Sequence, residues 1–427
     1  MKKLFTLTLC LLLAISLLGG CARGGGKEEV GRVYYLNFKP EANDDWQKLA
    51  KAYTEETGVE VKVVTAASGE YEKTLGVEID KDAAPTLFQV NGPIGLAAWK
   101  DYALNISDSA VVKELISDEF ALKADGKVYG VAFAYEAYGL ITNKKLLADA
   151  GYSIDQITDF ASLKQIAEDI HARADQLGFD AFTSSGLDGS SSWRFSGHLT
   201  NLPLYYEFTE DKVTSQPATI KGTYLDNFKA VWDLYIQNSA TDPKTLTSKT
   251  GSDAVAEFQN GKAVFYQNGT WEYANALSIG KENIGYLPIY FGVADQAQGL
   301  CAGTENYWVV NSQASEADRK ATLDFMHWLA TSETGTAAMA GGEMGFVCPF
   351  KKAKTPDNVL FDEVDKLIEG GKQSIKWMFP YTPNTDAWRA EVVSALAAYS
   401  AGEQDFEVVR KAIVDGWAKQ YTASQGQ

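Results

Sequence analysis

The chain has 427 residues, a length that suits two or more ordinary domains, each with a sizeable core. It carries 56 acidic against 39 basic side chains, and its net charge is −17. Such a negative surface repels nucleic acid and other polyanions, so we expect no nucleic-acid partner and favour a protein that handles neutral or cationic small molecules.

The first 29 residues predict export and anchoring. Two lysines precede an apolar run over residues 4–18, which has the layout of a secretory signal and is short for a membrane span. The sequence LGGC, which ends at Cys21, resembles a lipobox, the site where bacterial lipoproteins are cut and lipidated on cysteine. We therefore expect a signal peptide over residues 1–20, a lipid on Cys21 and a flexible tether over residues 21–29. An uncleaved N-terminal anchor helix is the alternative.

Strands and helices alternate from the start of the expected folded region. The predicted elements are a strand at 33–38, a helix at 44–57, a strand at 59–64, a helix at 71–79 and a strand at 86–90. Strand, helix, strand, helix, strand at this rhythm indicates an α/β fold with a largely parallel sheet.

The same kind of pattern restarts in the second half of the chain. The predicted elements are helices at 160–177 and 225–237, strands at 181–183, 263–267 and 307–310, and helices at 271–277, 315–330, 386–399 and 405–421. Two α/β lobes fit this order better than one, with a boundary near Thr142.

The sequence has no Gly-x-x-x-x-Gly-Lys phosphate loop, no Gly-x-Gly-x-x-Gly, no His-Glu-x-x-His and no Gly-x-Ser-x-Gly motif, and each of the three histidines is more readily structural than catalytic or metal-binding. We expect no cofactor, no metal and no catalytic residue. Four acidic residues at expected strand ends or in loops leave a glycosidase-like pair open: Glu136, Asp188, Glu272 and Glu305. Cys301 and Cys348 fit either two buried thiols or one disulfide.

Ten tryptophans are many for this length, and most fit a hydrophobic core. The expected core tryptophans are Trp46, Trp232, Trp308, Trp328 and Trp417, while Trp388 fits core and binding site equally. Trp193, Trp271 and Trp377 lie instead in polar or irregular stretches. A sugar site needs such residues, because the apolar face of a pyranose stacks on an indole while polar side chains bond its hydroxyls. Loop packing is the alternative.

Several candidate residues follow predicted strands. Lys39 and Glu41 come after the first strand, Asn91 follows the third, and Trp271 follows the strand at 263–267. In open α/β sheets, ligands bind beyond the carboxyl ends of the strands, so these positions strengthen the case for one site.

Five segments carry a family likeness. DGKVYGV at 125–131 and YEAYGLITNK at 135–144 resemble the segment that crosses between lobes in extracellular solute-binding proteins of ABC importers. FQNGKA at 258–263 with NGTW at 268–271 looks like that family's later signature, and the stretch from 302 to 350 also fits. The likeness covers essentially the whole mature chain and is closest to the sugar-binding group that includes maltose-binding protein.

The resemblance implies a two-lobed periplasmic-binding-protein-like fold of type II, in which each lobe is a largely parallel sheet flanked by helices. Lobe 1 would comprise 30–136 plus 305–352, and lobe 2 would comprise 140–302 plus 356–422. A hinge would close the two lobes over a sugar in the cleft.

The resemblance also implies roles for individual residues. By segment match, Glu136 corresponds to a position that bonds sugar hydroxyls and Trp271 to a stacking tryptophan, while Trp193 falls in a loop that supplies an aromatic residue. The remaining candidates for ligand binding are Asn91, Lys39, Glu41, Arg194, Asp188, Glu305 and Trp377. The chain departs from the family pattern at residues 142–144, where Thr-Asn-Lys stands in place of Tyr-Asn-Lys.

These inferences combine into one expected function. The protein would be a monomeric lipoprotein on the outer face of the cell membrane that captures neutral oligosaccharides, with malto-oligosaccharides or similar α-linked sugars as the leading ligands. It would deliver them to the membrane subunits of an ABC importer without catalysis. The alternatives are a surface glycoside hydrolase and a receptor of the same fold for a non-sugar solute, such as a metal or a polyamine.

Overall fold

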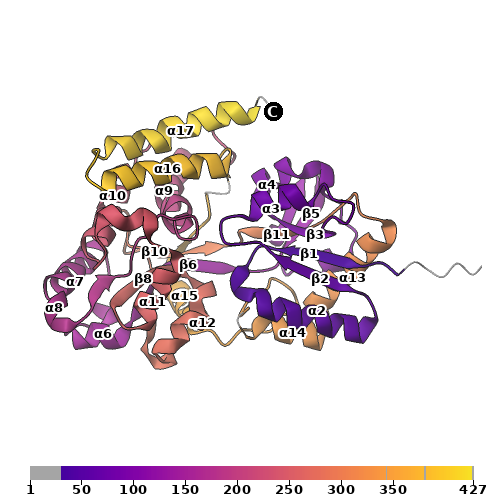
Figure 1. Ribbon diagram of the computed structural model, residues 1–427, viewed down its shortest axis with the longest axis horizontal. Coiled ribbons are helices and arrows are strands. Elements are labelled where there is room, and N and C mark those ends of the chain that lie inside the picture. The colour runs from indigo at the N-terminus through magenta and orange to yellow at the C-terminus, as the bar shows by residue number, and fades with distance from the viewer. Residues whose placement is uncertain (1–29, 343, 379–380, 426–427) are drawn as a thin grey trace, which may run out of the picture.

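The structure is a computed structural model that describes residues 30–342, 344–378 and 381–425 (Figure 1). Two lobes lie side by side, each built on a sheet of six strands with helices packed around it. The expected signal peptide, the lipidated Cys21 and the tether fall outside the described residues. No helix within the described residues is long and apolar enough to cross a membrane.

The sheet of the first lobe has the strand order β2-β1-β3-β11-β5-β4. Its strands are β1 (Val33–Asn37), β2 (Val61–Thr65), β3 (Leu87–Asn91), β4 (Ala121–Ala124), β5 (Lys127–Ala132) and β11 (Asn306–Val310). Its helices are α2 (Asn43–Thr57), α3 (Tyr71–Glu78), α4 (Gly92–Ala98), α5 (Ala110–Lys113), α13 (Glu316–Thr331) and α14 (Glu333–Ala340). Helix α2 buries Trp46, Leu49 and Tyr53 on one face, as the 3–4 spacing of these residues predicts.

The sheet of the second lobe has the order β12-β10-β6-β8-β7, and β9 also pairs with β6. Its strands are β6 (Glu136–Asn143), β7 (Asp180–Phe182), β8 (Ala263–Gly269), β9 (Ile284–Leu287), β10 (Gln298–Gly303) and β12 (Gln373–Ile375). Its helices are α6 (Lys144–Asp149), α7 (Phe160–Ala172), α8 (Ala174–Leu177), α9 (Asn201–Asp211), α10 (Leu225–Gln237), α11 (Gly251–Gln259), α12 (Tyr273–Ala276), α15 (Val359–Glu369), α16 (Thr385–Ser400) and α17 (Glu407–Gln425).

Both sheets are mixed, so the prediction of largely parallel sheets is wrong. Strand β1 runs parallel to β2 and β3, whereas β11 is antiparallel to β3 and β5, and β6 is antiparallel to β8, β9 and β10. Parallel neighbours need a crossover helix, which only part of the chain supplies. Strands β4 and β5 form a hairpin instead, because Asp125 and Gly126 adopt positive φ angles of 51° and 72° at the turn.

The chain passes between the lobes three times, and two of these crossings are adjacent segments, from β5 to β6 and from β10 to β11, while the third lies between α14 and α15. Glu136 pairs with Gly303 at the second-lobe end of the two adjacent crossings. The hydroxyl of Thr304 donates a hydrogen bond to the carbonyl of Ala134 at 3.1 Å, which ties the two crossings together. The lobe ranges expected from the family resemblance remain a prediction.

Each lobe has its own hydrophobic core, and the tryptophans fill much of both. Trp46 and Trp308 are fully buried in the first lobe, and Trp232 and Trp417 are fully buried in the second. Trp388, which the sequence leaves open, also belongs to the second core and contacts Trp417 edge-on. Cys301 and Cys348 are free thiols packed in or against different cores, so the disulfide alternative is wrong.

Candidate ligand-binding cleft

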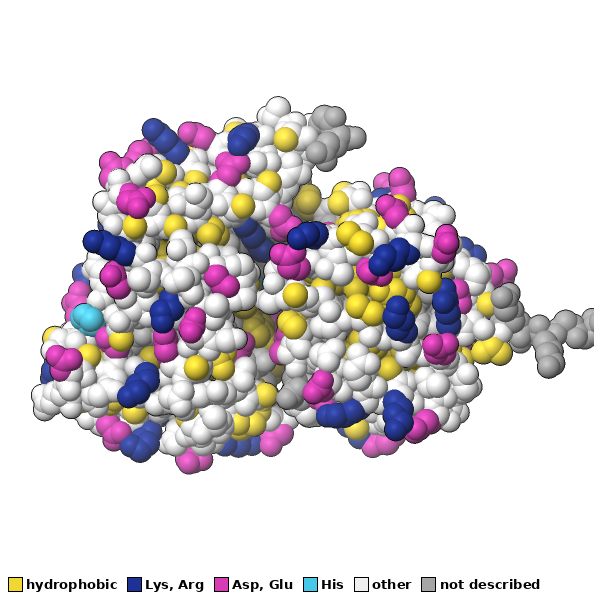
Figure 2. Space-filling view, in the orientation of Figure 1, with side chains coloured by type: hydrophobic (Ala, Val, Ile, Leu, Met, Phe, Trp, Pro, Cys, Tyr) yellow, Lys and Arg dark blue, Asp and Glu magenta, His cyan; other side chains and the backbone are white. Residues whose placement is uncertain are grey.

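A cavity of about 350 Å³ lies between the two lobes, within the size range of small-molecule sites. The first lobe contributes the loops after β1 and β2, together with Asn91 at the end of β3. The second lobe contributes residues from the loop before α9, the start of α11, the end of β8 and the first turn of α16. Figure 2 shows the groove that separates the lobes. The cavity therefore lies where the carboxyl ends of parallel strands predict a site.

The two lobes touch beside this cavity. A Cβ placed on Gly69 would lie only 2.6 Å from the carbonyl oxygen of Gly189, so the loops on either side of the groove meet backbone to backbone. Gly69 also has a φ of +78°, which an L side chain rarely adopts. Only glycine meets both demands at this position.

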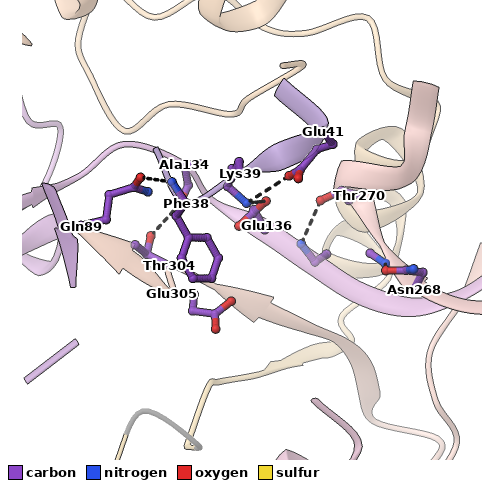
Figure 3. A network of polar contacts seen from close by, with 12 residues as sticks. Phe38, Lys39, Glu41, Gln89, Ala134, Glu136, Asn268, Thr270, Thr304 and Glu305 are labelled. Carbon is purple, nitrogen blue, oxygen red and sulfur yellow. Dashed lines mark hydrogen bonds and ion pairs between the residues drawn. The ribbon is translucent and has the colours of Figure 1, made fainter. Parts of the chain in front are cut away.

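A buried ion pair joins the first lobe to the crossing strand β6. The Nζ atom of Lys39 lies 2.7 Å from Oε1 of Glu136 and 3.7 Å from Oε1 of Glu41 (Figure 3). The side chains of Lys39 and Glu136 are only 6% and 8% exposed. Burial lowers the pKa of Lys39, but the carboxylates of Glu136 and Glu41 outweigh burial and raise it to about 12. The lysine is therefore charged at physiological pH.

Trp271 lies at the end of β8, in the short 3₁₀ helix Thr270–Glu272, and is partly buried. Its six-membered ring leans on the backbone of Gly269, where a Cβ would lie 2.2 Å from the ring. The Nζ atom of Lys39 lies 5.7 Å from the ring centroid, and the ring of Tyr138 stacks nearby at 6.2 Å. The indole is thus held in place by groups on several sides.

Trp193 forms a second aromatic wall of the cavity. Its ring centroid lies 5.8 Å from that of Trp271 with the planes at 50°, and its Nε1 donates a hydrogen bond to the carbonyl of Ser190 at 2.9 Å. The imidazole of His198 contacts both indoles edge-on, at 5.1 Å and 5.6 Å. Two angled indoles beside a polar rim can stack on the apolar faces of a ligand while its polar groups find partners.

Other candidates occupy less direct positions. Arg194 borders the cavity, but its guanidinium donates to the backbone carbonyls of Ser184 at 3.1 Å and Gln267 at 3.3 Å, so it holds the loop in shape. The structure does not bring Asp188 and Trp377 into the cavity wall. The Asp188 carboxylate accepts a hydrogen bond from Ser190, and Trp377 packs in the second core. Ligand binding by Asp188 and Trp377 remains a prediction that their positions do not favour.

Sequence reasoning assigned no role in binding to His198 or Arg389, which both line the cavity. His198 lies in the π-helical turn Arg194–Leu199, and its Nε2 is 3.9 Å from Oε2 of Glu305. Burial and the charge of Arg389 lower the pKa of His198 to about 3. The one local signal was the short RFSGHL segment, which follows no helical apolar period.

The buried histidine predicts a measurable loss of stability in acid. Its unfolded pKa is about 6.5, so below pH 6.5 the unfolded state takes up a proton that the folded state binds only near pH 3. Stability from the neutral histidine is therefore complete above pH 6.5 and is lost as the pH falls. At pH 5 we expect the wild type to lose about 2 kcal/mol relative to His198→Gln. Urea unfolding of both proteins from pH 7 to pH 4 measures this difference, and parallel curves would contradict it.

A family model described as "Bacterial extracellular solute-binding protein" matches residues 48–363. A maltotriose-binding protein from Pyrococcus abyssi is 21% identical over 376 residues, which covers 83% of this chain and 74% of the relative.

Solved structures share the fold over nearly their whole length. The structure described as RafE in complex with raffinose superposes with a TM-score of 0.73 at 16% identity, covering 91% of this chain and 99% of that one. A chitin oligosaccharide binding protein superposes with a TM-score of 0.72 at 19% identity, covering 93% of this chain and 98% of that one. These likenesses confirm the expected two-lobed fold of type II. The family model spans more than half of the chain, and the protein belongs to the bacterial extracellular solute-binding proteins.

Proposed function

We propose that the protein is an extracellular receptor that captures neutral oligosaccharides in the inter-lobe cleft and delivers them to an ABC importer. The observation that carries the proposal is the pair of angled indoles, Trp193 and Trp271, in one cavity with the polar groups of Lys39, Glu41 and Glu136. The names of the relatives, which bind maltotriose, raffinose and chitin oligosaccharides, support sugar as the ligand class.

Capture follows from stacking, polar contacts and lobe closure. One sugar ring lies on the Trp271 indole, and its hydroxyls exchange hydrogen bonds with Glu136 and Lys39, which line the cavity. Because the ligand touches both lobes, it contacts more protein when the lobes are closed, so binding shifts the hinge towards closure. The protein would act without catalysis and as a monomer.

Calorimetric titration with maltotriose, raffinose, xylotriose and tri-N-acetylchitotriose tests the ligand class. We expect at least one sugar to bind in the micromolar range, at about −8 kcal/mol, with malto-oligosaccharides as the leading candidates. No binding below about 1 mM, where the free energy is about −4 kcal/mol, would contradict the proposal. Chromatography of the same mixtures should show intact sugar, since cleavage products would favour the hydrolase alternative. A thermal shift with Fe³⁺ or spermidine, but not with sugar, would favour a non-sugar solute.

Lipid anchoring of Cys21 on the outer face of the membrane is a separate part of the proposal. A lipidated cysteine with at least two acyl chains gives stable membrane attachment, and the glycine-rich residues after it let the receptor reorient. In the native host we expect wild-type protein in the membrane fraction and Cys21→Ser protein outside it. Equal membrane fractions for the two proteins would reject the lipid anchor.

A further inference from the structure

Arg389 reaches the cavity from the first turn of α16, over a residue that has no side chain. A Cβ placed on Gly197 would lie 2.5 Å from Nη2, 2.9 Å from Cζ and 3.1 Å from Nε of Arg389. The guanidinium therefore lies against the bare backbone of the π-helical turn Arg194–Leu199, whose residues are all buried. π-Helical turns are rare in proteins and are frequent at functional sites.

Glu305 approaches the same turn from the segment between β10 and β11. It follows β10 in the second crossing segment, next to the crossing that carries Glu136 (Figure 3). Its carboxylate lies 3.9 Å from His198, the residue directly after Gly197, so Glu305 and Arg389 flank one turn of backbone. Both side chains line the cavity.

The two groups also influence each other's charge. Burial raises the pKa of Glu305, and the nearby Arg389 opposes this shift. Withdrawal from water lowers the pKa of Arg389, while the carboxylates of Glu305 and Asp386 favour its charged form. Asp386 lies three residues before Arg389 on α16 and also lines the cavity, so this part of the wall holds two carboxyl groups around one guanidinium.

The carboxyl groups beside Arg389 decide which chemical groups of a ligand can bind there. An arginine without a carboxylate beside it is a receptor for carboxylates and phosphates, because its planar fork matches them. A second anion beside Arg389 would instead be repelled by Glu305 and Asp386. A hydroxyl both donates and accepts, so it can accept from the guanidinium and donate to the carboxylate at once.

We propose that Glu305 is a specificity-determining residue, which acts together with Arg389 on the same cavity wall so that this part of the cleft binds the hydroxyls of neutral sugars and rejects acidic sugars. The inference rests on the proposed function and adds a charge filter to it. Removal of the Glu305 charge should convert Arg389 into a receptor for a sugar carboxylate.

The test compares one sugar in two charge states. The neutral ligand is the trisaccharide that wild type binds most tightly in the panel above, and the acidic ligand is the same sugar with its primary hydroxyls oxidised to carboxylates. We expect wild type to prefer the neutral form by about 100-fold or more. Glu305→Gln should bind the acidic form about tenfold more tightly and the neutral form more weakly. The double variant Glu305→Gln/Arg389→Gln should lose this tenfold gain in affinity for the acidic sugar.

If Glu305 has only a structural role, Glu305→Gln will weaken the binding of both sugars equally and leave the ratio of their affinities unchanged. That result would overturn the inference. If wild type binds no neutral sugar, the proposed function fails and the inference fails with it. If wild type binds a neutral sugar but Glu305→Gln keeps the same preference, only the inference fails.

A second variant moves the guanidinium without removing a charge. Gly197→Ala places a methyl group where Arg389 lies, so we expect at least about a tenfold loss of affinity for the neutral sugar. Gly76→Ala in α3 is the control, because nothing lies within 4 Å of a Cβ there, and it should bind within twofold of wild type. Arg389→Lys serves the same purpose if Gly197→Ala does not fold, since it keeps the charge but loses the fork. Unchanged affinity in either variant would contradict a role for Arg389 in binding.

Discussion

Replacing Trp271 by alanine is expected to weaken oligosaccharide binding by about 1–3 kcal/mol, a 5- to 150-fold rise in Kd, with little change in stability. The indole is only partly buried and lies on the cavity wall, so its removal takes away a stacking surface but leaves both hydrophobic cores complete. Trp193→Ala should behave in the same way. Calorimetric titration gives the affinity, and urea unfolding gives the stability.

Two further variants show whether the lost ring is what matters. Trp271→Phe keeps a smaller aromatic face and should recover part of the affinity. Trp328→Phe alters a tryptophan of the first core that lies away from the cavity, and it should leave the affinity unchanged. If Trp193→Ala and Trp271→Ala both unfold the protein, these residues act as core and the stacking role is wrong.

Replacing Lys39 by methionine is expected to destabilise the protein by about 3–5 kcal/mol. The substitution keeps the apolar stem but leaves the carboxylate of Glu136, whose side chain is 8% exposed, without the ammonium 2.7 Å away. An uncompensated buried charge costs far more than an ion pair contributes. Denaturant unfolding followed by tryptophan fluorescence measures the loss.

The double variant Lys39→Met/Glu136→Gln should recover most of this stability, because the more deeply buried carboxylate is then neutral and Glu41, which is left, is 28% exposed to water. A double variant no more stable than Lys39→Met would contradict the explanation. The pKa of Lys39 is raised from 10.5 to about 12, so the stability that the ion pair contributes is complete below pH 10.5 and is lost as the pH rises towards 12.

Local periodicity predicted many elements of the fold well. The helix expected at 225–237 coincides with α10, because its apolar residues recur every three or four positions and all face one core. Strand direction was beyond such reasoning. Whether β11 runs parallel or antiparallel to β3 depends on the route of the chain through the other lobe, and no short segment of sequence encodes that route.

The residues of the candidate site also fall into those that the sequence could predict and those that it could not. Trp271 and Lys39 could be predicted because each follows a strand, where the topology of α/β sheets places ligands. Arg389 could not, because its position depends on contact with Gly197, which is remote in sequence. Trp377 lies in an irregular stretch that reads as exposed in the sequence, whereas contacts with His198 and Gly303 leave its indole only 8% exposed.

The contact between Gly69 and Gly189 has a consequence for release of the cargo. Two bare stretches of main chain meet there, so the two lobes touch at this point without interlocking side chains. Parting them at this point uncovers little apolar area and costs little free energy. In a receptor of the proposed kind, the closed conformation is then stabilised largely by the bound ligand. The lobes can therefore separate readily once the ligand has left.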